Sequence, residues 1–309
     1  MKLIITLLVL FLISIGYTRA DTYSVVIWNN GTSVNVGLAD VTSGNQAQLK
    51  LTLQDFYYQN PVIQSSTYNY ATKLLSFYTF QISNRIPTLF VVDCNSWTVV
   101  SKTTYNSVFL YGGLASTNTP DNNVFTTYTD NSYIYVARLD SSQNIVKFDA
   151  VYGSYRGSVY VPTIDSYYVA FTNKTGLYVR IYNSNYQLSS EAAFGFSNNR
   201  YPVNDFPLNL VYDAKNNGVL AQVSMTDSRN NLYYALAYLD WNNNTFDVTN
   251  MYGNLKDRFT TTVPDSNNLD YAYTFAYLNF GATNLYIFNT ATNTFVSSRP
   301  YNTLVLSAF

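Results

Sequence analysis

One motif recurs along the whole chain and limits what the chain can fold into. A run of β-branched and aromatic residues ends at Asp or Asn, a few polar residues follow, and a second apolar run then begins. The marker residues are Asp40, Asp93, Asp140, Asn183, Asp240 and Asn289, spaced 43 to 57 residues apart. The side chain of Asp or Asn can accept a hydrogen bond from the backbone two residues on, which closes a turn. Each marker therefore predicts a hairpin.

The apolar runs themselves are typical of strands. Segments such as "TLFVVD", "SYIYVARL" and "GLYVRIY" are rich in Val, Ile, Tyr and Phe, and clusters of Asn, Asp, Ser, Gly and Pro separate them. Asn30-Gly31 and Asn217-Gly218 predict tight hairpins, since a type I′ turn needs positive φ at both central residues. No segment combines a 3.6-residue apolar stripe with helix caps. The sequence therefore predicts an all-β fold.

Each period of about 50 residues holds three or four antiparallel strands. One such sheet cannot bury both of its faces, whereas sheets stacked face to face around an axis bury them all. The pattern resembles β-propeller repeats in general over nearly the whole mature chain, and the markers would close the hairpin between the two outer strands of each blade. No WD or kelch motif specifies a named family.

Six markers predict a single propeller of six blades. Seven blades remain an alternative if Tyr57–Asn69, or the long stretch before Asp240, forms a degenerate blade. The rival all-β architecture is a pair of β-sandwich domains, which would also give frequent turns. Two sandwiches would not produce six similar hairpins, which favours the propeller.

The N-terminus predicts secretion. Residues 1–20 combine Lys2, an apolar run over Leu3–Ile15, and Thr18 and Ala20 before a cleavage point, which is the layout of a signal peptide. The mature domain is then 21–309, in the extracellular space. Three N-x-S/T sequons, at Asn30, Asn173 and Asn243, predict N-glycans on exposed loops. After signal cleavage we expect no membrane insertion.

Composition excludes several kinds of chemistry. The chain has no His, one Cys (Cys94) and one Glu (Glu191), which removes histidine-based triads and His or Cys zinc sites. Charged residues make up 11% and the net charge is −1, so nothing attracts nucleic acid. We expect no cofactor. Calcium is the metal that this residue set could hold, and its weak candidates are Asp265, Asn267 and Asp270.

The 31 tyrosines are the remaining unusual feature. Most are expected to pack between strands, while a few next to turns could form a binding face: Tyr57, Tyr58, Trp97, Tyr201 and Trp241. The leading hypothesis is a glycosylated, non-catalytic extracellular propeller that binds a protein or a glycan, or mediates adhesion. The alternatives are a calcium-dependent propeller hydrolase of the lactonase type and a structural matrix or coat component.

Overall fold

The computed structural model describes residues 23–309 apart from 43, 45, 59–62, 106–108, 131, 197–200, 203–207, 227–228, 248–256, 266–269 and 278–282. The described chain is built from β-strands, with a short 3-10 helix, η2 (Pro162–Ile164), between two of them. The all-β prediction is confirmed. The predicted signal peptide lies outside the described residues. In the described part of the chain, no helix is long and apolar enough to span a bilayer.

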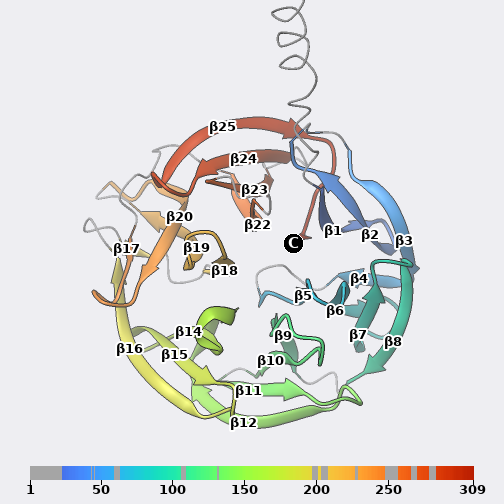
Figure 1. Ribbon diagram of the computed structural model, residues 1–309, viewed down its shortest axis with the longest axis horizontal. Helices are drawn as coiled ribbons and strands as arrows, with labels where there is room; N and C mark the ends of the chain where they lie inside the picture. Colours follow the sequence, from blue (N-terminus) through green and yellow to red (C-terminus); the bar gives the residue numbers. More distant parts are fainter. Residues whose placement is uncertain are drawn as a thin grey trace, which may run out of the picture.

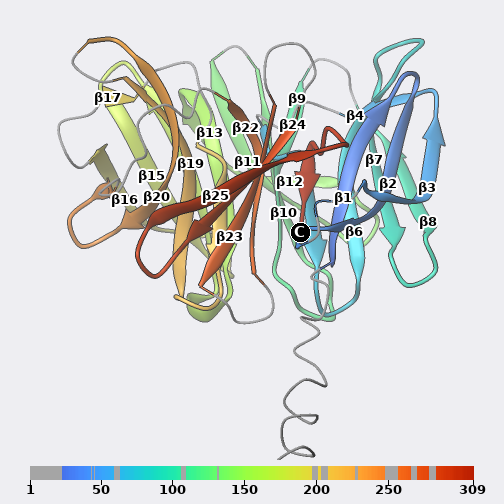
Figure 2. The same cartoon turned by 90° about the horizontal axis from the view of Figure 1, so that it is seen from above.

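Antiparallel sheets stand around a central axis (Figure 1), and Figure 2 shows the same ring from its edge. The first sheet contains, in spatial order, β26 (Ser307–Ala308), β1 (Tyr23–Asn30), β2 (Ser33–Asp40) and β3 (Gln48–Gln54). The second contains β4 (Phe56–Tyr58), β6 (Leu74–Gln81), β7 (Pro87–Asp93) and β8 (Thr98–Thr104), with β5 (Ser66–Asn69) also paired to β6. The third contains β9 (Leu110–Ser116), β10 (Val124–Thr129), β11 (Tyr133–Leu139) and β12 (Ile145–Tyr152).

A nine-stranded sheet and a further four-stranded sheet complete the ring. The nine strands are β13 (Ser154–Val161), β14 (Ser166–Asn173), β15 (Gly176–Asn183), β16 (Leu188–Phe196), β17 (Tyr201–Pro202), β18 (Leu210–Asp213), β19 (Gly218–Thr226), β20 (Leu232–Asp240) and β21 (Thr245–Asp247). Only two residue pairs, Gly195 with Thr245 and Phe196 with Phe246, join β16 to β21, and this pairing is parallel. The last sheet contains β22 (Arg258–Pro264), β23 (Tyr271–Tyr277), β24 (Thr283–Asn289) and β25 (Thr294–Tyr301).

The two ends of the described chain close the ring together. Strand β26 pairs with β1, so one sheet combines three early strands with one late strand. The backbone N–H of Phe309 donates to the carbonyl of Val25 at 3.0 Å, and Val25 N–H donates back to Phe309 at 3.1 Å. This arrangement covers the faces that the first and last sheets would expose in an open stack. The propeller prediction holds, and the pair of sandwich domains does not.

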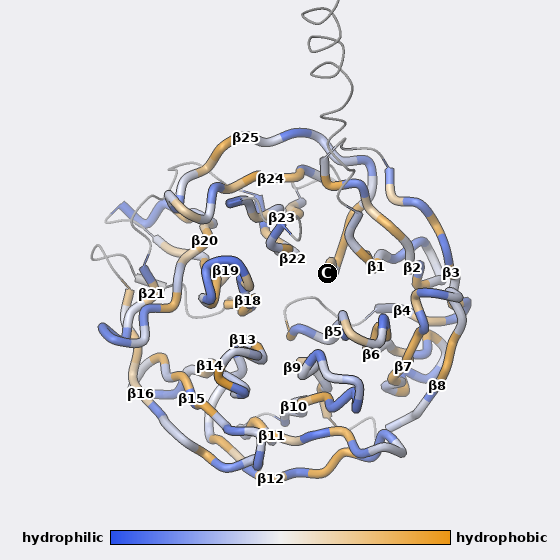
Figure 3. Tube along the Cα trace, in the orientation of Figure 1, coloured by the Kyte–Doolittle hydropathy of each residue, from blue (hydrophilic) through white to orange (hydrophobic). Residues whose placement is uncertain are grey.

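The apolar core lies between the sheets rather than at one centre, and Figure 3 shows apolar segments on every sheet. One cluster packs Ile27 and Val36 of the first sheet against Phe77 and Phe90 of the second. Another joins Val26 of the first sheet to the last sheet. Because each sheet has a neighbour on both faces, its strands can be apolar on both sides.

Tyrosine is the residue that joins many of these faces. Tyr167 on β14 is fully buried and donates to the carbonyl of Gly113 on β9 at 2.6 Å. The hydroxyl of Tyr78 on β6 lies 3.0 Å from Oγ1 of Thr126 on β10. Each ring is thus buried between two sheets while its hydroxyl finds a polar partner on the neighbouring sheet. This pattern supports the expectation that most tyrosines are structural.

The marker prediction is confirmed. Counted outward from the axis, each of the six markers ends the third strand of its set, or directly follows it; these strands are β2, β7, β11, β15, β20 and β24. Each marker therefore stands just before the outer hairpin. Asp93 Oδ1 accepts from Asn95 N–H at 2.8 Å and Asp240 Oδ1 from Asn242 N–H at 3.0 Å. Asn289 differs slightly, because its Oδ1 accepts from Thr292, three residues on, at 2.9 Å.

The two Asn-Gly pairs do lie at hairpins, but neither forms the expected type I′ turn. Between β1 and β2 the turn residues are Gly31 and Thr32, and Gly31 has φ of 60°. Between β18 and β19 the loop is four residues long and ends at Asn217, with φ of 48°. The Tyr57–Asn69 region forms no extra sheet, since β4 and β5 both pair with β6.

The marker turns predict a specific sensitivity to acid. Hydrogen bonds lower the pKa of Asp93, Asp140 and Asp240 below the ordinary value of 3.8. The strongest effect comes from the N–H of Asn95 on Asp93, and from the side chains of Asn144 and Asn243 on the other two. A carboxyl group whose pKa is lower in the folded than in the unfolded state stabilises the fold above about pH 4. This stabilisation is lost as the pH falls through the folded-state pKa.

The triple variant Asp93→Asn, Asp140→Asn, Asp240→Asn keeps the Oδ1 acceptors but does not titrate. We expect it to be slightly less stable than the parent near pH 7 and to lose less stability between about pH 5 and about pH 2. Urea unfolding at a series of pH values measures both. An equal loss in the two proteins would show that these turns do not contribute to acid sensitivity.

Candidate functional site

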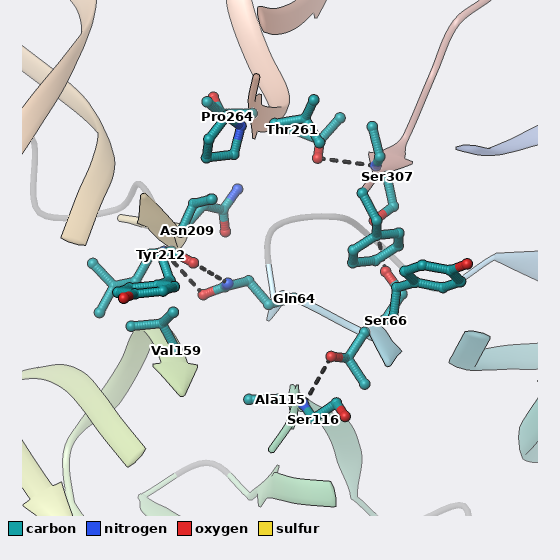
Figure 4. Close-up of a pocket in the computed structure, with 18 of the residues that line it drawn as sticks. Gln64, Ser66, Ala115, Ser116, Val159, Asn209, Tyr212, Thr261, Pro264 and Ser307 are labelled. Carbon is teal, nitrogen blue, oxygen red and sulfur yellow. Dashed lines mark hydrogen bonds between the residues drawn. The ribbon is translucent and has the colours of Figure 1, made fainter. Parts of the chain in front are cut away.

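A pocket of about 630 Å³ lies on the axis of the ring. Its lining comes from the innermost strands of all the sheets, and Figure 4 shows these side chains converging from different sides. The strands that contribute are β5, β9, β13, β18, β22 and β26, together with Tyr58 of β4. Its volume is in the range of pockets that hold small-molecule ligands.

Gln64 crosses the middle of this pocket (Figure 4). Its Nε2 donates to the carbonyl of Leu210 at 2.8 Å, and its Oε1 accepts from the N–H groups of Ser158, at 2.6 Å, and Leu210, at 3.2 Å. The side-chain amide thus acts as a peptide group between β13 and β18, whose inner edges would otherwise lack a partner at this point. Gly157 makes room for it, because a Cβ there would lie 3.0 Å from Gln64 Oε1.

Several hydroxyl groups lie on the remaining wall, between apolar side chains such as Leu114 and Val159. Thr67 Oγ1 accepts from Ser116 N–H at 2.9 Å, which ties β5 to β9. Thr261 Oγ1 accepts from Ala308 N–H at 3.1 Å, which ties β22 to β26. Ser66 Oγ lies 2.7 Å from Ser307 Oγ, which ties β5 to β26. Short hydroxyl residues suit this position because they satisfy the inner edges without filling the axis.

One mouth of the pocket lies where the innermost hairpins turn, because its lining includes Tyr70, Pro162 and Lys215, which follow β5, β13 and β18. Tyr68 and Tyr70 meet edge to face at this mouth, with ring centroids 5.0 Å apart, and Tyr70 is 49% exposed. Burial raises the pKa of Tyr68, so this phenol stays neutral at physiological pH.

The charged groups at the mouth are already engaged. Asp213 is buried; its Oδ1 accepts from the N–H of Lys215 at 3.1 Å, and its Oδ2 accepts from the side chains of Asn216, at 2.7 Å, and Tyr238, at 3.1 Å. The ammonium of Lys215 lies 2.5 Å from Asp270 Oδ1.

The predicted calcium candidates do not form one described site. Asp265 lines the pocket, is buried, and accepts from the hydroxyl of Tyr273 at 2.9 Å. Asp270 pairs with Lys215, as above, and Asn267 lies outside the described residues. Among the described residues, no group of three or more His, Cys, Asp or Glu side chains is close enough to hold a metal ion.

The five predicted binding-face aromatics are scattered. Tyr57 is 51% exposed on β4, and Trp97 and Trp241 are half-buried against two different core clusters. Tyr58 is 1% exposed, and its hydroxyl lies 2.6 Å from Ser66 Oγ; it lines the pocket instead of standing on an outer face, because alternate residues of β4 point to opposite sides. The side chain of Tyr201 lies outside the described part.

The sequon asparagines all lie at turns. Asn30 and Asn243 are exposed, and Asn173 is half-buried. Asn243 Nδ2 donates to Asp240 Oδ2 at 2.7 Å, and Asn173 Oδ1 accepts from Thr175 N–H at 2.8 Å. Cys94 packs against a core cluster, and burial raises its thiol pKa to about 12, which makes it a poor nucleophile.

The comparisons with known proteins support the fold alone. No protein-family model matches the sequence, and neither does any curated protein. The TolB crystal structure from Acinetobacter baumannii is similar at 15% identity with a TM-score of 0.63, over 94% of this chain and 66% of TolB. A protein of unknown function from Bacteroides caccae is similar at 10% identity and a TM-score of 0.57, over 94% and 98% of the two chains.

A third similar structure is a chain of the nidogen/laminin complex, at 12% identity and a TM-score of 0.50, over 92% of this chain and 97% of that one. Together with the ring of sheets, these similarities define the chain as a β-propeller-type protein without a specific family. At such low identity they carry no information on its ligand.

Gln64 gives a direct test of how the pocket is held together. Replacing it with Ala removes the link between β13 and β18, and replacing it with Glu sets a carboxylate oxygen against the carbonyl of Leu210. We expect each variant to lower the free energy of unfolding by about 1–3 kcal/mol, because buried backbone groups lose their partners. Gln54→Ala, on the exposed face of β3, is the matched control and should change stability little.

Urea unfolding of the four proteins measures the effect. If the Gln64 variants matched Gln54→Ala, the amide would not be a structural bridge across the axis.

Proposed function

We propose that this protein is a single six-bladed β-propeller, spanning residues 21–309, that is secreted, N-glycosylated and acts as a non-catalytic extracellular binding module. The observation that carries the proposal is the axial pocket, which takes its lining from the innermost strand of every sheet. A pocket of this size, with aromatic groups at one mouth and hydroxyl groups on its wall, suits recognition of a ligand. A protein or glycan is the partner class that we propose.

The blade number is supported by the sheet contacts. The parallel pairing of β16 with β21 is only two residue pairs long, so the nine-stranded sheet divides naturally into β13–β16 and β17–β21. Counted in this way, the described strands give six units. The hydrophobic clusters agree, because one lies at each junction between successive units. Examples are the contacts of Phe125 on β10 with Tyr167 on β14, and of Tyr234 on β20 with Phe259 on β22.

The proposal of a non-catalytic role is supported by the neutral chemistry of the pocket wall. The polar groups deep in the pocket are hydroxyls and carboxamides such as Gln64, Thr67 and Thr261, which are poor acids and bases at physiological pH. The carboxylates at the mouth, Asp213 and Asp265, hold neighbouring tyrosines in place through hydrogen bonds. We propose no resident cofactor and no calcium requirement.

Secretion and glycosylation are tested together by expressing the full chain in a eukaryotic secretory host. We expect the protein in the medium, with an N-terminus at Asp21 and a mass that falls after treatment with an N-glycosidase. The variant Asn30→Gln, Asn173→Gln, Asn243→Gln is the control and should show no such fall. Retention inside the cell, or an intact residue 1, would contradict the proposal.

The binding role is tested by blocking the pocket. Thr261→Phe places a ring into the axial space, while Thr104→Phe adds the same ring on the exposed outer strand β8. In a thermal-shift screen of saccharides, amines, organic acids and short peptides, we expect a ligand that stabilises the parent and Thr104→Phe but not Thr261→Phe. Circular dichroism checks that both variants fold.

Two results would overturn this role. One is that no ligand distinguishes Thr261→Phe from Thr104→Phe. The other is that the parent converts a ligand to product, above all if calcium starts the reaction and a chelator stops it, because this would favour the calcium-dependent hydrolase.

A further inference from the structure

A buried carboxamide in the pocket wall has an oxygen for which the described residues supply no partner. Asn209 is 6% exposed and lines the pocket, and Figure 4 shows its side chain directed toward the cavity. Among the described residues, no donor reaches its Oδ1. A buried carbonyl without a hydrogen bond costs free energy, so native structures rarely retain one unless water or a ligand supplies the donor.

The orientation of this amide is coupled to that of Gln222 by a chain of hydrogen bonds. Asn209 Nδ2 donates to Gln222 Oε1 at 2.9 Å, and Gln222 Nε2 donates in turn to Thr262 Oγ1 at 2.8 Å. Thr262 is held by Thr274, with 2.8 Å between the two hydroxyl oxygens. Flipping Asn209 alone would place its oxygen against Gln222 Oε1, so the two amides can only flip together. In the orientation observed, the network presents an acceptor, Asn209 Oδ1, at this point of the wall. A sugar hydroxyl both donates and accepts, and so it suits either orientation of the amide.

Donors lie on other sides of the same space. Oγ1 of Thr67 and Oγ1 of Thr261 each accept from a backbone N–H, so both hydroxyl protons remain for other acceptors. These residues belong to β5 and β22, which approach the axis from different sides (Figure 4). The pocket thus offers two neutral donors, the hydroxyls of Thr67 and Thr261, and one neutral acceptor, Asn209 Oδ1, on different parts of its wall. A ligand that satisfies them must carry several groups that both donate and accept.

The mouth adds an aromatic surface without an unengaged charge. The rings of Tyr68 and Tyr70 line it, and the electron-rich face of an aromatic ring attracts the weakly positive C–H groups of an aliphatic ring. The charged side chains there already have partners, as Lys215 has in Asp270 and Asp213 has in Tyr238. An ionic ligand would have to displace these contacts.

We propose that the axial pocket binds a neutral saccharide, with a ring hydroxyl donating to Asn209 Oδ1, others accepting from Thr67 or Thr261, and the C–H face of the ring against the tyrosines. The inference rests on the proposed binding function and assigns its ligand class. The same chemistry is offered by a free monosaccharide and by the terminal residue of a glycan.

The test uses the full secreted protein and saturation-transfer NMR. The neutral probes are glucose, galactose, mannose and N-acetylglucosamine, each as free sugar and as methyl glycoside, and the charged probes are choline and citrate. We expect saturable binding of at least one neutral sugar and weaker or no binding of the charged probes. Binding of the free sugar alone indicates a free ligand, whereas binding of the glycoside as well indicates a glycan terminus.

Asn209→Leu removes the acceptor. Thr261→Val removes one donor together with the acceptor of the Ala308 N–H, so circular dichroism checks that this variant folds. Each should weaken the binding about tenfold or more, since a lost buried hydrogen bond has an effect of this order. Thr104→Val on β8 is the matched control and should leave binding unchanged. If Asn209→Leu fails to fold, Thr261→Val carries the test by itself.

Two outcomes overturn the saccharide inference: none of the neutral sugars binds, or the sugar that binds does so equally well to Asn209→Leu and Thr261→Val. If choline or citrate occupies the pocket instead, and Thr261→Phe blocks it, the binding function stands and only the ligand class is wrong. If no ligand of the wider screen distinguishes Thr261→Phe from Thr104→Phe, the binding function itself fails.

Discussion

The contact between the faces of neighbouring sheets is the interaction on which the rest of this protein depends. The described residues include no disulfide partner for Cys94, so stability comes from packing. Tyrosine suits this contact because its ring fills the space between two sheets while its hydroxyl reaches a polar group on the second. Two tyrosines join the nine-stranded sheet to the third sheet in this way. The hydroxyl of Tyr167 donates to the carbonyl of Gly113 at 2.6 Å, and that of Tyr182 donates to Asp149 Oδ2 at 2.7 Å. A chain with this many sheet faces to join has a use for many tyrosines.

Ring closure by these contacts creates the pocket as a consequence. Sheets that pack face to face leave their innermost strands around an axis, and the inner edges of those strands need hydrogen-bond partners. The chain supplies them with short side chains, as Thr261 does for Ala308, and with one long amide, Gln64. Space remains because these groups satisfy the backbone without filling the centre. The pocket and its polar lining thus have one physical origin.

The sequence predicted what is local and missed what arises from closure. The markers were found because an Asp or Asn turn lies within a few residues, as at Asp93 and Asn95. Tyr58 was expected on an exposed face because neighbouring turn residues do not reveal which side of a short strand is buried. Gln64 and Asn209 gave no signal at all. Gln64 contacts Leu210, the residue after Asn209, across 146 residues of chain. The positive φ angles of Gln64, 48°, and Asn209, 36°, mark the local geometry as unusual, but neither angle can be read from the sequence.

The low charge of the chain also explains the chemistry of its centre. An ion on the axis would be surrounded by sheets on every side and would pay a large desolvation cost without a paired charge. The charged residues of the lining, such as Asp213 and Lys215, therefore lie near the mouth, and the polar groups deeper in the pocket are amides and hydroxyls beside apolar side chains. Such groups discriminate between ligands by the direction of hydrogen bonds and not by net charge. The coupling of Asn209 to Gln222 and Thr262 holds its side chain in place, which a neutral site needs in order to be selective.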